Sequence, residues 1–138
     1  MSEVLEQKIA LNGNIEASLM GDQVALVGLD LDAIPSDIAL YARGIKKLDF
    51  SWNNLTDIAH LEAFGAELIS LVLDNNALPA SLHLPPLPHL TTLWVNNNKI
   101  ADLDLFLAHV RQQCPALTYL SMLKNAACPN FFTGKDSD

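Results

Sequence analysis

One pattern of aliphatic and polar positions recurs along the chain. It has the form L-x-x-L-x-L-x-x-N-x-L, with other apolar side chains at some leucine positions. The four clear copies begin at Ile45, Leu68, Leu90 and Leu117. A weaker copy consists of Val24, Val27, Leu29, Asp32 and Ile34. Successive copies begin roughly 20–29 residues apart, which is typical of a structural repeat that contains one strand.

This pattern predicts an α/β fold, a leucine-rich repeat solenoid of about five repeats. In such a repeat the apolar positions form a short strand, and the strands of successive repeats stack in parallel. Their side chains point into one continuous core that no single repeat closes alone. We therefore expect a concave parallel sheet over residues 24–130, with helical, 3₁₀ and extended segments on the convex side.

The asparagine of each repeat stands where the chain turns away from its strand. A side-chain amide both donates and accepts hydrogen bonds, so it satisfies backbone groups that the turn would otherwise bury without partners. We predict a structural ladder of side chains at these positions. Its members are Asn53, Asn76, Asn98 and Asn125.

The segments between the strands differ from one another. Residues 56–66 carry apolar side chains at three-residue spacing, which suits a 3₁₀ or short helical turn. Residues 78–88 are rich in proline, which excludes a regular helix and favours an extended chain. Before the last copy, Asp102 suits the N-cap of an α-helix. Its apolar side is expected to consist of Leu103, Leu107 and Val110.

The two ends of the repeat stack need covers, because a terminal repeat exposes its core. Residues 1–23 are expected to form an N-terminal cap, with a hairpin around Asn12 and Gly13. Phe131 and Phe132 are candidates to cover the last repeat, and residues 131–138 are expected to form a loose C-terminal tail.

The charge and composition narrow the class of partner. The chain has 138 residues, with 16 acidic against 8 basic side chains and a net charge of −8. That balance argues against direct binding to nucleic acid or to an anionic membrane, because both need a basic face. No apolar run is long enough to cross a bilayer, and the polar start differs from a secretory signal. We expect a cytoplasmic, monomeric protein with reduced cysteines and no membrane insertion.

The sequence shows none of the residue patterns that carry catalysis. No histidine stands at a metal-ligand spacing from another, and glycine-rich phosphate loops and G-x-S-x-G elbows are absent. Cys128 falls where the core of the last repeat closes, which favours a buried thiol over a nucleophile. We therefore expect no enzyme, no metal and no cofactor. The P-x-x-P spacing of residues 85–88 leaves a ligand for an SH3-like domain as a minor alternative.

The outward positions of the strands are the usual binding surface of such a fold. Both tryptophans fall at these positions, and exposed aromatic side chains are frequent interface anchors. We predict a partner-binding surface made of Lys47, Asp49, Trp52, Val72, Asp74, Trp94, Asn96, Tyr119 and Ser121. The alternative is that Trp52 and Trp94 pack only against their neighbours on the sheet.

The later repeats carry a more specific resemblance. Their segments L-V-L-D-N-N, L-P-P-L-P-H-L and a closing N-x-A-C-P-N lie within 71–76, 84–90 and 115–130. Over roughly residues 45–130 the chain resembles the leucine-rich melanocyte differentiation-associated protein family. Members of that family continue past the closing segment with a further cap and a charged tail. A more distant resemblance is to the A-prime protein of the spliceosomal U2 particle.

The closer resemblance implies a non-enzymatic adaptor in melanosome and endosome-related trafficking. Its implied partners are an active Rab-type small GTPase and the endosomal recycling complex. The distant resemblance leaves an alternative, a structural subunit of a ribonucleoprotein that contacts protein more than RNA. GTP-dependent capture of a small GTPase would favour the first function, and RNA that co-purifies with the protein would favour the second.

Overall fold

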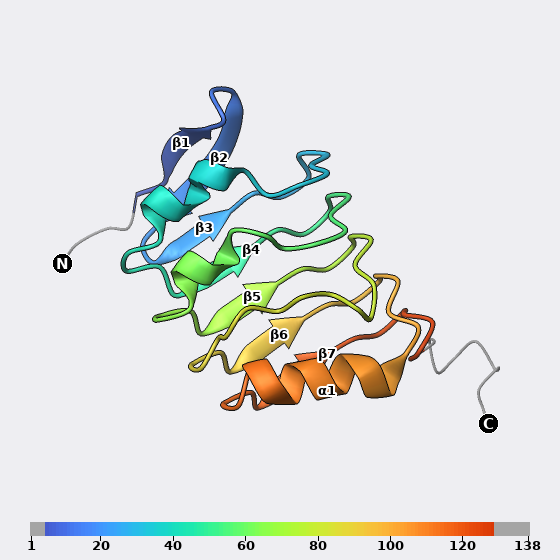
Figure 1. Cartoon of the computed structure of the whole chain (residues 1–138). Coiled ribbons are helices and arrows are strands. Elements are labelled where there is room, and N and C mark those ends of the chain that lie inside the picture. Colours follow the sequence, from blue (N-terminus) through green and yellow to red (C-terminus); the bar gives the residue numbers. More distant parts are fainter. Residues whose placement is uncertain (1–4, 129–138) are drawn as a thin grey trace.

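A seven-stranded sheet organises the chain in the computed structural model, which describes residues 5–128 (Figure 1). The strands lie in chain order across the sheet: β1 Gln7–Leu11, β2 Ile15–Met20, β3 Gln23–Ala25, β4 Lys47–Asp49, β5 Ser70–Val72, β6 Thr92–Trp94 and β7 Tyr119–Ser121. Pairing is antiparallel from β1 to β3 and parallel from β3 to β7. The described part is therefore an α/β fold with a mostly parallel sheet and few helices.

The parallel strands are aligned by an aliphatic side chain at the centre of each. These residues lie side by side in register: Val24, Leu48, Leu71, Leu93 and Leu120. A second row, just past the strands, is buried throughout: Leu26, Phe50, Leu73, Val95 and Met122. Side chains alternate between the two faces of a strand. The residues beside the central row therefore point away from the core.

The connections between the parallel strands lie along one side of the sheet (Figure 1). The 3₁₀ helix η1, Ser36–Tyr41, follows β3, and a second, η2, Leu61–Phe64, follows β4. The connection from β5 to β6 contains no helix, and the α-helix α1, Leu103–Gln113, precedes β7. Three of these segments have the conformation that the sequence predicts, and η1 was not expected.

The helix α1 begins at its expected cap and buries the expected side, to which Phe106 is added. The Asp102 carboxylate accepts a hydrogen bond from the Leu105 N–H at 3.0 Å. The buried residues of α1 are Phe106 and Val110, whereas Leu103 and Leu107 are half-buried. Residues four apart lie on one helix face. Phe106, which the sequence analysis left out, is therefore the central contact of the helix with the core.

The N-terminal residues form an antiparallel hairpin that extends the sheet. β1 and β2 pair along the length of β1, and β2 then pairs with β3. The turn of the hairpin holds Asn12 and Gly13 at positive φ, a conformation that asparagine and glycine adopt most readily. Leu11 and Ala17 are fully buried. The hairpin therefore extends the core at the edge of the parallel sheet that β3 forms (Figure 1).

The structure corrects the register of the weak first repeat. Val24 pairs with Leu48, the second apolar position of the next repeat, whereas the sequence analysis aligned Val24 with the first. Val27 and Leu29 were expected in the core, but they are 44% and 37% exposed. Leu29, and not Asp32, therefore stands where the later repeats have asparagine. Strand pairing sets this register, and a single degenerate copy of the pattern specifies it poorly.

Several expectations concern residues outside the described range. These are the first four residues of the 1–23 cap, Phe131, Phe132 and the whole of the 131–138 tail. The last two residues of the 24–130 repeat region lie there too. Within the described range, none of the helices has the length and apolar character needed to span a bilayer.

Candidate interaction surface

The asparagines of the four clear repeats connect each turn to the one before it. The Nδ2 of Asn98 donates at 3.0 Å to the carbonyl of Val95 in its own repeat and to that of Leu73 in the preceding repeat. Its Oδ1 accepts from the Leu78 N–H at 3.0 Å. The same links are made by Asn53, Asn76 and Asn125. Because both ends of the amide are occupied, these side chains support the fold and offer little to a ligand.

The face of the sheet opposite the core is not covered by any described part of the chain. One row of this face consists of Lys47, Ser70, Thr92 and Tyr119, and the next of Asp49, Val72, Trp94 and Ser121. A third row follows the strands: Asp74, Asn96 and Leu123, with the buried Ser51 at its β4 end. We call these three rows the exposed sheet face. The structure thus brings together every predicted surface residue except Trp52.

Polar side chains of the third row are linked across neighbouring strands. The Asp74 carboxylate accepts a hydrogen bond from the Asn96 N–H at 2.7 Å. The Oδ1 of Asn96 in turn accepts from the Leu123 N–H at 2.7 Å and from the Ser121 hydroxyl at 2.8 Å. Part of the hydrogen-bonding capacity of this row is therefore used within the sheet. Asn96 is mainly a support for the face.

The half of the face around β4 and β5 is charged. Burial raises the pKa of the Asp74 carboxyl, hydrogen bonds from Asn96 act in the opposite direction, and the charge of Asp49 adds to the rise. The Oδ1 of Asp49 accepts from the Ser51 N–H at 2.9 Å and from its hydroxyl at 2.6 Å. Lys47 is exposed on the same strand. This half therefore carries two carboxyl groups and one ammonium group.

The half of the face around β6 and β7 is aromatic. The ring centroids of Trp94 and Tyr119 lie 5.7 Å apart, with a tilt of 45° between the ring planes. Trp94 is 37% and Tyr119 49% exposed even so. The two rings pack on each other, which agrees with the alternative that Trp94 packs against its neighbours on the sheet. That contact nevertheless leaves much of both rings open to solvent.

Trp52 lies apart from this pair, in the turn after β4. It is 63% exposed and has a φ of 62°, in the left-handed region. The same position is held by Asn75, Asn97 and Lys124 in later repeats and by Gly28 in the first, all at positive φ. This conformation costs a residue with a Cβ atom about 1–2 kcal/mol. Trp52 is thus both strained and exposed, at the end of its strand.

The two cysteines belong to the core side. Burial raises the pKa of the Cys114 thiol to about 11, so this thiol is protonated at neutral pH. Cys128 is half-buried, and neither cysteine forms a disulfide. Across residues 5–128, no cluster of three histidine, cysteine or acidic side chains is placed to hold a metal ion.

Two features of the exposed sheet face were missed from the sequence. One is Leu123, which follows β7 and is 61% exposed. The other is the chain of hydrogen bonds from Asp74 through Asn96 to Ser121. Aligning the repeats one position past the third apolar residue would have put Ser51, Asp74, Asn96 and Leu123 in one row. The hydrogen bonds themselves depend on rotamers, which repeat spacing does not specify.

Comparison with known proteins identifies a relative. The leucine-rich melanocyte differentiation-associated protein of Homo sapiens is 44% identical over 95 residues, which are 67% of this chain and 48% of that protein. No family model and no solved structure matches the chain. The comparisons give no support to the distant resemblance to the A-prime protein. They confirm the closer one: the chain is a relative of the leucine-rich melanocyte differentiation-associated protein and spans about half of that protein's length.

Proposed function

We propose that the chain is a leucine-rich repeat solenoid of about five repeats that serves as a non-enzymatic protein–protein interaction module. The exposed sheet face, which is the concave side of such a solenoid, binds the partner. One parallel strand per repeat and an asparagine link at each clear turn support the repeat assignment. The leucine-rich name of the relative agrees with it.

The observation that carries the proposal is the uncovered aromatic pair of Trp94 and Tyr119. Tryptophan and tyrosine are enriched among the residues that dominate binding energy. Contact between the two rings restricts their rotamers, which lowers the conformational entropy lost on binding. Polar groups of Asp74 and Asn96 lie at the strand ends beside it. An apolar centre with a polar rim is the usual anatomy of a protein interface.

The conformation of Trp52 gives a second support. Glycine or asparagine would occupy this left-handed turn at a lower cost, and the indole ring gains little burial in return. Strained and exposed residues of this kind occur at functional sites more often than elsewhere. We therefore include Trp52 in the contact surface, at its edge.

The class of partner is proposed from the resemblance. The name of the relative links that protein to melanocyte differentiation. By extension, this chain is a monomeric adaptor in the cytoplasm that acts in melanosome or endosomal trafficking. Its partner is a Rab-type small GTPase in the active state or the endosomal recycling complex.

A binding assay with purified GTPases tests the proposal. A panel of Rab-type GTPases, each loaded with a GTP analogue or with GDP, is titrated onto the immobilised chain. We expect binding that prefers the GTP-analogue form of at least one of them. Trp94→Ala should weaken that binding by about 30-fold, because an aromatic anchor contributes about 2 kcal/mol or more. Trp52→Gly should also weaken it without lowering the melting temperature.

Leu40→Ala is the matched control. Leu40 is 81% exposed on η1, away from the exposed sheet face, so its removal should leave both binding and folding unchanged. Thermal melts identify any variant that has lost its fold. If folded Trp94→Ala and Trp52→Gly proteins bind as tightly as wild type, the face is not the binding site. RNA that co-purifies with the protein would instead favour the ribonucleoprotein subunit.

A further inference from the structure

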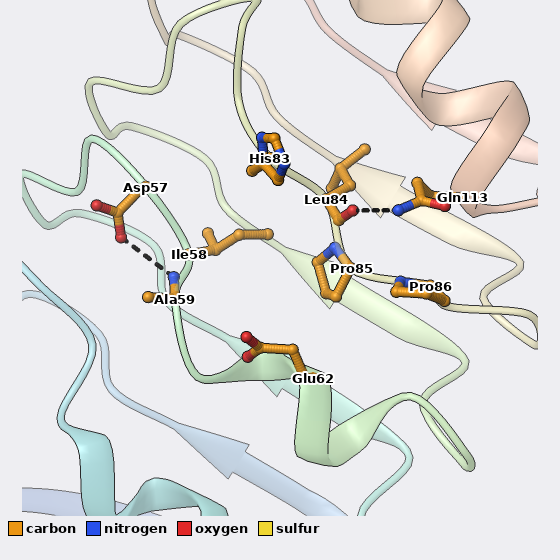
Figure 2. Close-up of a pocket in the computed structure, with 9 residues that line it drawn as sticks. All are labelled: Asp57, Ile58, Ala59, Glu62, His83, Leu84, Pro85, Pro86 and Gln113. Carbon is orange, nitrogen blue, oxygen red and sulfur yellow. Dashed lines mark hydrogen bonds between the residues drawn. The ribbon is translucent and has the colours of Figure 1, made fainter.

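A cavity of about 450 Å³ lies among the connections, away from the exposed sheet face (Figure 2). One side is formed by the segment that leads into η2, with Asp57, Ile58 and Glu62. The other is formed by the extended proline segment, with His83 and Pro85 among its lining residues. None of these residues belongs to the surface proposed above. We call this hollow the return-side cavity.

Specific contacts hold the walls of the return-side cavity in place. The Nε2 of Gln113, at the end of α1, donates to the Leu84 carbonyl at 2.7 Å, and the Gln113 carbonyl accepts from the Leu87 N–H at 2.8 Å. Gly65, just past η2, allows a close approach on the other side, because a Cβ atom there would lie 2.7 Å from the Pro86 carbonyl oxygen. The cavity is therefore part of the folded structure and needs no rearrangement to open.

The lining of the return-side cavity combines apolar walls with negative charge. Pro85 and Pro86 present hydrocarbon to the space, whereas Ile58 is buried, and the Glu62 carboxylate extends from η2 toward Ala59 (Figure 2). One oxygen of Asp57 accepts from the Ala59 N–H at 3.1 Å, but within residues 5–128 the Glu62 carboxylate has no hydrogen-bond or ion-pair partner. No lysine or arginine is among the described residues that line the cavity. A complementary ligand is a cation on an apolar stem.

A smaller hollow of about 260 Å³ shares His83, Leu84 and Gln113 with the return-side cavity. It also reaches His109 on α1, whose Nδ1 is buried and has no hydrogen-bond partner among the described residues. A buried polar atom of this kind is normally satisfied. A peptide chain that continues from the cavity into this hollow would lie beside His109.

We propose that the return-side cavity binds an arginine side chain of a peptide segment in a second protein partner. The planar guanidinium lies flat against the Pro85 ring and forms paired hydrogen bonds with the Glu62 carboxylate, and its methylene stem covers Pro86. A lysine ammonium lacks both the plane and the fork. The net charge of −8 adds a general attraction for a basic segment. This site would make the chain a connector with two separate contact surfaces.

The test uses the isolated chain and a minimal probe. Nα-acetyl-arginine N-methylamide is titrated into the ¹⁵N-labelled protein and followed by amide chemical shifts. We expect saturable shifts at Ala59, Glu62 and His83, with a dissociation constant in the millimolar range and weaker binding at higher salt. The citrulline analogue has the same shape without the charge. It should bind at least about fivefold more weakly, as should the arginine probe to Glu62→Gln.

Two controls separate this site from the rest of the molecule. Glu16→Gln makes the same chemical change at an exposed position on β2 and should leave the arginine affinity unchanged. Trp94→Ala should also leave it unchanged, although that variant is expected to lose the partner of the exposed sheet face. Equal affinity for arginine and citrulline, an unaffected Glu62→Gln variant, or shifts centred on Asp49 and Asp74 would overturn the proposal.

Discussion

The strand side and the connection side of this molecule follow different rules. On the strand side, one solution recurs: a central aliphatic residue, a second buried residue and an asparagine that bonds to the preceding turn. On the connection side, every segment differs, from the 3₁₀ helix η1 through the proline segment to the helix α1. The difference shows that strand pairing requires the same residue pattern in each repeat, whereas the packing of the connections does not.

The physical reason lies in how the backbone is satisfied on each side. Parallel strands must align their hydrogen-bonding groups with both neighbours, so each repeat has to present the same length and register. The connections satisfy their backbone locally or through side chains, as Gln113 does for the Leu84 carbonyl. The only requirement that the connections share is that they cover the apolar side of the sheet. Any backbone that places Phe64, Leu82 or Phe106 in the core fulfils it.

The largest effect on stability is expected when one core side chain is removed from the strand side or from the connection side. Leu93 on β6 and Phe106 on α1 are both fully buried. Leu93→Ala should lower the free energy of unfolding by about 2–5 kcal/mol and Phe106→Ala by about 3–5 kcal/mol, because each leaves a cavity. Urea unfolding followed by circular dichroism measures both. A loss below about 1 kcal/mol for Phe106→Ala would mean that α1 is docked loosely and that the two sides do not share one core.

A medium effect is expected from the asparagine links. Asn98→Ala should cost about 1–3 kcal/mol, because it leaves buried carbonyl and N–H groups of two repeats without partners. Asn54→Ala is the matched control, since Asn54 is exposed and its side chain donates only to the Asp30 carboxylate. We expect a change within about 0.5 kcal/mol for the control. Equal thermal melts for the two variants would show that the links contribute nothing to stability.

The smallest effect concerns the charge at Asp74 on the strand side. Its folded-state pKa lies above the ordinary value of 3.8. The fold therefore favours the protonated carboxyl, and the associated stability is present at low pH and is lost as the pH rises through the raised pKa. Asp74→Asn keeps an acceptor for the Asn96 N–H and removes the charge. It should be slightly more stable than wild type at neutral pH, by up to about 0.5 kcal/mol.

Chemical unfolding at neutral pH and at about pH 3 measures this difference, which should vanish at the lower pH because Asp74 is then protonated in both states. Asp32→Asn, at an exposed carboxyl outside the sheet, controls for the general effect of a lost charge. An advantage of Asp74→Asn that grew toward low pH would contradict the sign of the shift.

Sequence spacing predicted the strand side well, apart from its first repeat. The spacing of leucines and asparagines from Ile45 onward predicted the positions of β4 to β7. The residues between these strands predicted the kind of segment that connects them. It failed at Val24, where the pattern is degenerate and where pairing with β4 sets the register. It also grouped Trp52 with the aromatic pair. The left-handed turn instead keeps this side chain at the end of its strand.

The sequence by itself determined the repeat, the parallel register of the later strands, the asparagine positions and the cap of α1. These features depend on residue type and spacing along the chain, which are local properties. Only the tertiary structure decided that Trp94 touches Tyr119, that Phe106 is a core residue of α1, and that Glu62 and Pro85 line one cavity. The contact of Trp94 with Tyr119 depends on side-chain rotamers on neighbouring strands, whereas the positions of Phe106 and Glu62 depend on how the connections pack in space.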